Sequence, residues 1–469
     1  MRVLLINPPI DNMVTTNIPP YVDEQRGCNP PLGLMYVAAY AEQHTEYEIE
    51  ILDMLAEGIS YDRLESELRR RKPDIVGITT MTFTLVDVMI VADIVKAADK
   101  GVKVVLGGPH VHIYPEETIR LPEVDFLVLG EGELPFTELL QNIDDYQSLK
   151  DIKGIVFKCK GEVINTGPRE LIEELDSLPF PARHFTKINK YNSLLAKGSL
   201  ATTMITSRGC PYNCLFCHRP HLGKKFRARS AINVVDEMEE CVNMGIKEIL
   251  VYDDTFTIDK QRVMDICNLI LERGVGITWD IRTRVDIIDM EMLKALKKAG
   301  CERIHYGVES ANPEILKVLR KGITLPQVAS AFKMTKEVGI STLAYFMLGS
   351  PFETKEQIMD TLNYAKRLEP DYCHFSITTP FPATPLYEMG IKRGIFEDYW
   401  REFAANPRMD FEPQYWEEDL SRDELTQLLD YAYKTFYTRP KYVLRQMRKV
   451  RSFSEFRRKA KAGLRVLKP

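Results

Sequence analysis

Short apolar segments alternate with longer amphipathic ones through the first 145 residues. The short segments are rich in Val, Ile and Leu and predict strands, whereas the longer segments carry apolar residues at helical spacing. Strands that alternate with helices need crossover connections, which favour a parallel sheet. We therefore expect a doubly wound α/β domain over residues 1–145, with strands at 2–7, 48–55, 74–82, 102–106 and 125–129 and helices at 31–42, 61–71 and 85–98.

A second alternating series begins at residue 200. Residues 146–199 hold two extended segments around Lys160-Gly161 and are expected to form a hairpin linker. Six strand–helix units over residues 200–390 are typical of a partial (β/α)6 barrel, whose chemistry gathers at the carboxyl ends of its strands. We expect strands at 202–206, 248–252, 278–283, 303–307, 342–348 and 372–377, and helices at 232–244, 260–272, 290–298, 326–338 and 355–368.

Residues 391–469 are predicted to be helical and to end in a basic tail. From Arg439 to Lys468, twelve residues are Lys or Arg and only Glu455 is acidic, although the whole chain has a net charge of -5. Apolar residues lie between these cations, which suits peripheral contact with an anionic membrane. The alternative is a solvated helix packed against the acidic remainder of the chain. We do not expect nucleic acid as a partner, because no readout motif accompanies the basic residues.

Composition places the chain among ordinary globular proteins. Its 469 residues are 45% hydrophobic and 28% charged, which excludes wholesale disorder and fibrous repeats and suits two or three domains. The sequence has no apolar run long enough for a spanning helix and no secretory signal, so we expect a cytoplasmic protein. The odd number of cysteines, nine, argues against a disulfide framework.

Three of the cysteines lie within one short segment, CPYNCLFC at 210–217. Its spacing puts the thiolates of Cys210, Cys214 and Cys217 on one loop after a predicted strand. A 4Fe-4S cluster normally takes four thiolates, so three would leave one iron without a protein ligand. Structural zinc is the alternative, with His218 or His221 as the fourth ligand.

This segment resembles the CxxxCxxC signature of the radical S-adenosylmethionine enzymes, and Phe216 matches the aromatic residue before the third cysteine. In that superfamily the open iron of a 4Fe-4S cluster binds S-adenosylmethionine, and electron transfer then releases a 5'-deoxyadenosyl radical. A doubly wound domain, a hairpin linker and this barrel resemble the cobalamin-binding class over residues 1–390. The resemblance implies a 4Fe-4S cluster, S-adenosylmethionine and cobalamin, together with an electron donor such as flavodoxin or ferredoxin.

The same resemblance assigns residues at the ends of the barrel strands to S-adenosylmethionine. Acids after the second strand would receive its amino group, and an arginine after the third would hold its carboxylate. Residues after the fourth and fifth strands would contact the ribose, the methionine portion and the adenine. The alternatives are helix caps for the acids and the serine, and an ion pair for the arginines. The candidates are Asp253, Asp254, Arg282, Arg284, Glu309, Ser310 and Gly349.

In the front domain, the resemblance places cobalamin beyond the carboxyl ends of the strands. Many cobalamin domains supply a cobalt-ligating histidine from a DxHxxG motif, but residues 7–11 read Asn-Pro-Pro-Ile-Asp here, and members of this class commonly lack that ligand. His110 and His112 lie near the expected pocket, where we expect hydrogen bonding rather than cobalt ligation. The residues expected to line the corrinoid are Thr79, Thr80, Thr82, Gly107, Gly108, Gly130, Glu131 and Gly132.

The resemblance implies methylation of an unactivated carbon in a hydrophobic substrate, such as a lipid or tetrapyrrole, or in a secondary metabolite. The alternatives are oxidative cyclisation, ring rearrangement or carbon–carbon coupling within the family, and a non-catalytic corrinoid or iron–sulfur binding protein from another class. No catalytic residue is assigned from the sequence. Tyr306, Tyr345 and Cys373 are candidate hydrogen donors, although we expect strand residues of this kind to be core.

Overall fold

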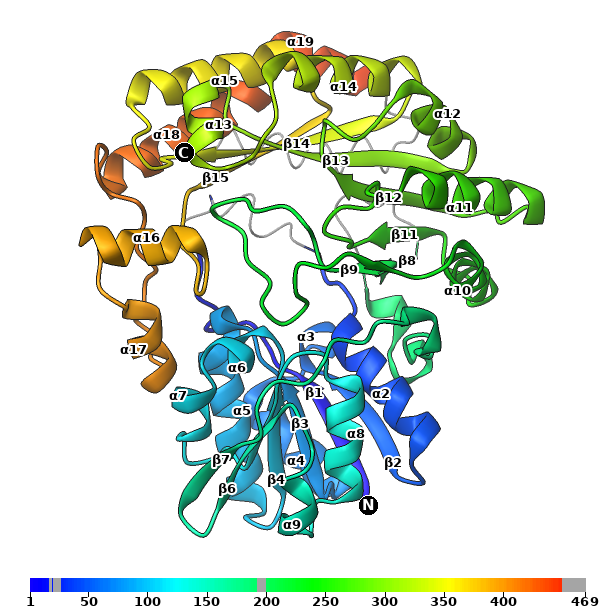
Figure 1. Ribbon diagram of the computed structural model, residues 1–469, viewed down its shortest axis with the longest axis vertical. Coiled ribbons are helices and arrows are strands. Elements are labelled where there is room, and N and C mark those ends of the chain that lie inside the picture. Colours follow the sequence, from blue (N-terminus) through cyan, green and yellow to red (C-terminus); the bar gives the residue numbers. More distant parts are fainter. Residues whose placement is uncertain (17–18, 20–26, 192–199, 449–469) are drawn as a thin grey trace.

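Two sheets joined by a connector form the protein, and helices cover both (Figure 1). The description covers residues 1–16, 19, 27–191 and 200–448 of a computed structural model. The N-terminal sheet has the order β2-β1-β3-β4-β5-β6-β7, in which β1 to β5 are parallel and the β6–β7 hairpin joins antiparallel at β5. The strands are β1 (Arg2–Asn7), β2 (Glu48–Asp53), β3 (Ile75–Thr79), β4 (Lys103–Gly107), β5 (Phe126–Val128), β6 (Ile155–Cys159) and β7 (Glu162–Asn165).

Separate hydrophobic cores lie on the two faces of this sheet. One packs under α4 and α5 and the other under α2 and α8, so the predicted doubly wound arrangement is confirmed. Because both faces are covered, the central strands β1, β3, β4 and β5 are largely apolar runs. The predicted hairpin around Lys160-Gly161 is also confirmed. The helices are α2 (Leu32–His44), α3 (Met54–Glu57), α4 (Tyr61–Arg71), α5 (Leu85–Ala98), α6 (Pro109–Ile113), α7 (Pro115–Ile119), α8 (Glu133–Gln141) and α9 (Tyr146–Leu149).

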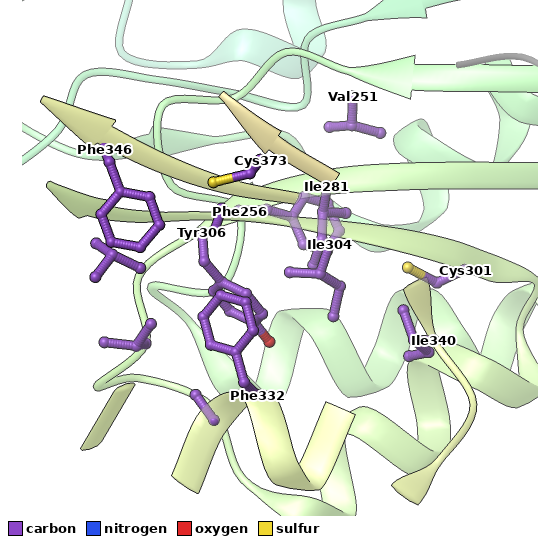
Figure 2. Close-up of a cluster of buried hydrophobic side chains, with 14 of the residues drawn as sticks. Val251, Phe256, Ile281, Cys301, Ile304, Tyr306, Phe332, Ile340, Phe346 and Cys373 are labelled. Carbon is purple, nitrogen blue, oxygen red and sulfur yellow. The ribbon is translucent and has the colours of Figure 1, made fainter. Parts of the chain in front are cut away.

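The second sheet is a curved half-barrel of six parallel strands in the order β8-β11-β12-β13-β14-β15, as the sequence predicts. Side chains alternate between its faces, and the outward set packs under the helices in one large core (Figure 2). Tyr306 and Cys373 belong to that set, which confirms them as core residues. The strands are β8 (Ala201–Met204), β11 (Glu248–Val251), β12 (Thr278–Thr283), β13 (Cys301–Glu309), β14 (Ser341–Leu348) and β15 (Tyr372–Ile377).

Short polar side chains begin the helices outside this sheet. Ser230, Asp259, Asp289, Thr324 and Thr354 each accept a hydrogen bond from the first turn of the helix that follows. The outer helices are α10 (Ala231–Asn243), α11 (Lys260–Arg273), α12 (Met290–Lys298), α13 (Pro313–Val318), α14 (Leu325–Glu337) and α15 (Lys355–Leu368). The connector before β8 contains the single turns η2 (Leu175–Ser177), η3 (Arg183–Phe185) and η4 (Ile188–Lys190), and η1 (Thr82–Thr84) follows β3.

The C-terminal helices complete the half-barrel and bind it to the first domain. Tyr433 and Tyr437 bond through their hydroxyls to the backbone of Phe375 and Cys373, which satisfies the open edge of β15. Helices α16 and α17 share a further core with the start of α5, which joins the two domains. The helices are α16 (Pro385–Arg393), α17 (Tyr399–Ala405), α18 (Arg422–Tyr437) and α19 (Pro440–Arg448).

The basic tail is described only as far as Arg448, and residues 449–469 lie outside the described residues. Within α19, Lys441 and Arg445 pair with Glu369, and Arg445 also donates to the carbonyl oxygens of Glu369 and Pro370. The described part of the tail therefore packs partly on an acidic position of the barrel. In the part of the chain that the structure describes, no helix is long and apolar enough to cross a membrane.

Candidate functional site

The cysteine segment lies on a long loop that is closed at its base. Strands β9 (Ser207–Arg208) and β10 (Arg227–Ala228) pair antiparallel, and the loop between them (green) lies between the two sheets (Figure 1). Gly209 begins the loop with φ of 82°, and a Cβ there would lie 2.2 Å from the carbonyl oxygen of Lys225. Only glycine fits at this position, immediately before the first cysteine.

The three cysteines share this loop, whose centre is held by the backbone. Leu215 N–H donates to the carbonyl of Leu319, and the carbonyl of Leu215 accepts from Leu386 N–H. Cys210 Sγ lies 3.7 Å from Thr255 Oγ1, at the end of β11. Burial raises the pKa of the Cys214 thiol, whereas Cys217 is exposed. Among the described residues, no three His, Cys, Asp or Glu side chains converge on one point as a formed metal site. The donor set, three thiols on one loop between two domains, nevertheless fits an iron–sulfur cluster by its chemistry.

Phe216 packs at the junction of the domains. It borders the core that α5, α16 and α17 share, and Lys321 Nζ lies 5.7 Å from its ring centre. His221 faces His112 of the N-terminal domain, with ring centres 6.5 Å apart. The aromatic residue before the third cysteine therefore secures the loop against both domains.

The two acids after β11 are both engaged within the protein. Asp253 accepts from the N–H and the hydroxyl of Thr206 and from the hydroxyl of Ser207, each at 2.6 Å, and so holds the junction of β8 and β9. Asp254 pairs with Arg219 at 2.7 Å. Neither acid caps a helix, since Asp259 caps α11. The bracing of the loop by Asp253 is a role that its spacing in the sequence did not signal.

The two arginines at the end of β12, Arg282 within the strand and Arg284 just after it, have different surroundings. Arg282 stacks on Tyr252, with its guanidinium carbon 3.7 Å from the ring centre, and donates to the carbonyl of Val251. Arg284 makes a two-pronged bond to Asp286, which is the ion pair that the sequence left open as its alternative. It also donates to the carbonyl of Lys321.

The candidates after β13 and β14 meet at one end of the half-barrel. Glu309 takes a left-handed conformation with φ of 70° and pairs with Lys321 at 2.7 Å. Ser310 bonds to Glu353 and Thr361, and Asn312 rather than Ser310 caps α13. A Cβ on Gly349 would lie 2.6 Å from the Leu425 side chain, so α18 approaches closely here.

Glu353 gives this corner a pH dependence. It is 1% exposed, and burial raises its pKa to about 7. The unfolded carboxyl ionises near pH 4.3, so from about pH 4.5 to about pH 7 only the folded state keeps the proton, and stability falls as pH rises through this window. The wild type should therefore lose up to about 3 kcal/mol of unfolding free energy across this window, and Glu353→Gln should not lose it. Denaturant unfolding of the wild type and of Glu353→Gln at about pH 5 and about pH 8 measures this difference. An equal change in unfolding free energy between the two pH values in both proteins would contradict it.

The predicted corrinoid residues lie where β3, β4 and β5 end. Thr80 N–H donates to the carbonyl of Gly107, and a Cβ on Gly108 would lie 2.8 Å from Thr80 O, so these loops pack backbone against backbone. Thr82 Oγ1 lies 3.1 Å from His110 Nδ1. Thr79 is partly exposed at the end of β3, Gly130 has open space at its Cβ position, and a Cβ on Gly132 would lie 3.2 Å from Val37.

Three histidines at this end of the sheet have buried ring nitrogens that meet no hydrogen-bond partner among the described residues. They are Nε2 of His110, Nδ1 of His112 and Nδ1 of His221. Burial lowers the pKa of His110 to about 3 and of His221 to about 4, so both rings are neutral. Buried polar groups normally have partners, so these nitrogens fit a bound ligand with polar arms, such as the amides of a corrinoid.

Glu131 ties this end of the sheet to the cysteine loop. Its carboxylate accepts from Arg208 at 2.7 Å and from Arg227 at 2.9 Å, the residues that face each other across β9 and β10. Arg208 also pairs with Glu133, and all four side chains are at least 90% buried. The sequence places Glu131 at the corrinoid site, whereas the structure gives its carboxylate a bridging role between domains.

Comparison with known proteins identifies the class. Residues 204–365 match the Radical SAM superfamily and residues 19–140 match the B12 binding domain. An uncharacterized methyltransferase of Pyrococcus horikoshii is 36% identical over 95% of each chain. The anaerobic magnesium-protoporphyrin IX monomethyl ester cyclase of Rubrivivax gelatinosus is 30% identical, over 85% of this chain and 71% of that protein.

A solved structure shares the two-domain fold. The cobalamin-dependent S-adenosylmethionine radical enzyme OxsB, with aqua-cobalamin and S-adenosylmethionine bound, superposes with a TM-score of 0.76 at 18% identity, over 99% of this chain and 72% of that one. The chain belongs to the radical S-adenosylmethionine superfamily, in the class that carries a B12 binding domain. Its cofactors are therefore a 4Fe-4S cluster, S-adenosylmethionine and cobalamin.

Proposed function

We propose that this enzyme methylates an unactivated carbon of a hydrophobic or secondary-metabolite substrate. The observation that carries the proposal is the position of the cysteine loop, which Glu131 and Phe216 hold between the B12 binding domain and the half-barrel. The relative that matches over 95% of both chains is called a methyltransferase, which supports the same reaction. Methyl transfer from a corrinoid needs the substrate between these two domains, which is where the loop lies.

In this proposal, Cys210, Cys214 and Cys217 hold the cluster, which with S-adenosylmethionine supplies one-electron chemistry. Residues at the ends of the barrel strands, among them Arg282, Glu309, Ser310 and Gly349, surround the S-adenosylmethionine. Asp253 takes part indirectly, by bracing the loop. The corrinoid lies against the loops after β3, β4 and β5, where the unpartnered histidine nitrogens supply hydrogen-bonding capacity.

The experiment is an anaerobic assay of reconstituted protein with iron, sulfide, hydroxocobalamin, reductant and a cell extract. We expect 5'-deoxyadenosine and S-adenosylhomocysteine to rise together when extract is added. Methyl-labelled S-adenosylmethionine then marks the substrate. Neither product from protein with an intact cluster would contradict an enzymatic role and favour a corrinoid or iron–sulfur binding protein.

A cyclase is the second candidate, because the Rubrivivax gelatinosus relative carries that name. A cyclase would form 5'-deoxyadenosine without transferring a methyl group. Deoxyadenosine alone in the same assay would therefore overturn the methylation proposal and support cyclisation, rearrangement or coupling.

Two partners belong to this proposal. An electron donor such as flavodoxin or ferredoxin reduces the cluster, and the basic tail places the enzyme against an anionic membrane on the cytoplasmic side. Val443, Leu444 and Met447 support the second point, because they leave an apolar side of α19 exposed among basic residues. We expect binding to phosphatidylglycerol vesicles that falls with added salt and with Leu444→Asp, measured by co-sedimentation. Equal binding to neutral phosphatidylcholine vesicles would contradict it.

A further inference from the structure

The inner face of the half-barrel is polar, unlike its outer face. Along β12 to β14, outward residues such as Ile281 and Phe346 pack under the helices (Figure 2). By the alternation of side chains along these strands, Asp280, His305 and Tyr345 occupy the opposite face. Buried charges contribute less to stability than apolar groups of the same volume. Their presence on the inner face therefore calls for a role other than packing.

These inner side chains form one connected network. Arg303 donates to Asp280 Oδ2 at 2.7 Å, and its Nε donates to His305 Nε2 at 3.2 Å. His305 Nδ1 lies 3.0 Å from the Tyr345 hydroxyl. His305 Nε2 lies 3.2 Å from both Arg303 Nε and Asp280 Oδ2. In the tautomer that accepts from the fixed N–H of Arg303 Nε, the ring proton lies on Nδ1 and is donated to the Tyr345 oxygen. The hydroxyl proton of Tyr345 is then left for another acceptor.

Only one end of this network is accessible. Asp280, His305 and Arg303 are 1%, 3% and 6% exposed, whereas Tyr345 is partly exposed. Burial lowers the pKa of His305, which keeps the ring neutral. Burial would raise the pKa of Asp280, but the nearby cations of Arg303 and Arg282 oppose it and the pKa is held at about 2. Burial raises the pKa of the Tyr345 phenol and keeps it protonated, and the cation of Arg282, two strands away in β12, opposes this rise. The network therefore presents one oriented hydroxyl at its accessible end.

We propose that Tyr345 is a substrate-positioning residue, which Asp280, Arg303 and His305 orient to donate a hydrogen bond to a carbonyl or anionic oxygen of the substrate. This inference rests on the proposed function, since it places the substrate within the half-barrel. Holding the donor in advance removes the cost of ordering it when substrate binds. It also names the substrate class, a molecule with an oxygen acceptor near the carbon that reacts.

The test uses full-length reconstituted enzyme and, as probe, the deproteinised small-molecule and lipid fraction of a cell extract. In Tyr345→Phe we expect unchanged cluster content. The amount of extract that half-saturates methyl transfer should rise roughly tenfold, the effect of one lost hydrogen bond to a substrate oxygen, while the plateau changes less. His305→Gln, which leaves the hydroxyl in place but unoriented, should give a smaller rise.

Tyr306→Phe is the matched control. Tyr306 lies on the outer face of the next strand, and its hydroxyl lies 2.8 Å from Thr335 Oγ1 within the core. A merely structural effect would appear in both variants, whereas a positioning role appears in Tyr345→Phe alone. Equal half-saturation in Tyr345→Phe and the wild type would overturn the inference.

A second readout separates this inference from the proposed function. Protein is incubated with the same fraction without S-adenosylmethionine or reductant, and the retained molecules are identified by mass spectrometry. We expect the wild type to retain a compound that Tyr345→Phe loses. If the wild type retains such a compound and Tyr345→Phe does not, but the full assay shows no methyl transfer, methylation is refuted and the positioning role is supported. Equal retention together with normal methyl transfer would refute the positioning role and leave the function intact.

Discussion

Replacing Cys210, Cys214 or Cys217 with alanine is expected to abolish reductive cleavage of S-adenosylmethionine. Losing even an outer partner of a metal ligand costs about 10- to 100-fold, so loss of a ligand should cost more than about a hundredfold. The three thiols share one closed loop, and no other cysteine of the described residues lies on it. Each is therefore expected to be indispensable.

Iron and sulfide analysis after anaerobic reconstitution tests this prediction directly, followed by assay of 5'-deoxyadenosine. Cys159→Ala is the control, because Cys159 is also a free cysteine but lies in β6, next to the edge strand β7 of the N-terminal sheet. We expect full cluster content in the control and little in the loop variants. A loop variant with normal iron and normal cleavage would refute the assignment, and zinc in place of iron would support the structural zinc site.

Both sheets could be predicted from the sequence because their strands carry local signals. The apolar runs of the N-terminal sheet and the alternation of strands with helices determine where strands form, and the structure shifts most boundaries by only a few residues. The larger differences are at β3, which ends at Thr79 rather than 82, and at β13, which runs from Cys301 to Glu309 rather than from 303 to 307. These residues lie where strands give way to loops, and there the periodic signal ends.

The contacts between distant segments could not be predicted in this way. Glu131 meets Arg208 and Arg227 across 77 and 96 residues, and Asp253 meets Thr206 across 47. No periodicity records such a pairing, so the sequence assigned both acids to cofactors by resemblance alone. The same holds for Tyr345, whose hydrogen bond to His305 spans 40 residues and distinguishes it from Tyr306 in the core. Local patterns thus predict the fold, whereas the roles of charged residues at strand ends depend on the tertiary structure.

Replacing Glu131 with alanine is expected to lower the free energy of unfolding by several kcal/mol. The carboxylate is 4% exposed and is shared by two guanidinium groups that are 9% and 1% exposed, and it also accepts from the backbone N–H of Ile172. Breaking a buried ion pair from one side leaves an uncompensated charge and costs about 3–5 kcal/mol. Arg208 would keep Glu133, so most of the cost should fall on Arg227.

Glu138→Ala is the matched control for the stability measurement. Glu138 lies on α8, close to Glu131 in the chain, and makes a two-pronged pair with Arg169, but the side chains are 37% and 26% exposed. An exposed pair of this kind contributes about 0.2–1 kcal/mol. Denaturant unfolding of the cofactor-free proteins should therefore separate the variants clearly. Equal losses of unfolding free energy in Glu131→Ala and Glu138→Ala would show that the ion pairs of Glu131 with Arg208 and Arg227 do not hold the domains together.

Glu131→Gln should separate the two halves of the reaction. The glutamine keeps the side-chain volume but loses the charge that draws β9 and β10 to the N-terminal sheet, so the cysteine loop can shift relative to that domain. Cleavage of S-adenosylmethionine depends on the loop and the half-barrel. Methyl transfer also needs the N-terminal domain to be correctly placed relative to the loop, and a displacement of about 1 Å can lower a rate about a hundredfold. We expect labelled methyl transfer to fall much further than 5'-deoxyadenosine formation. Equal losses of methyl transfer and of 5'-deoxyadenosine formation would show that Glu131 acts on the loop alone and not on the contact between the domains.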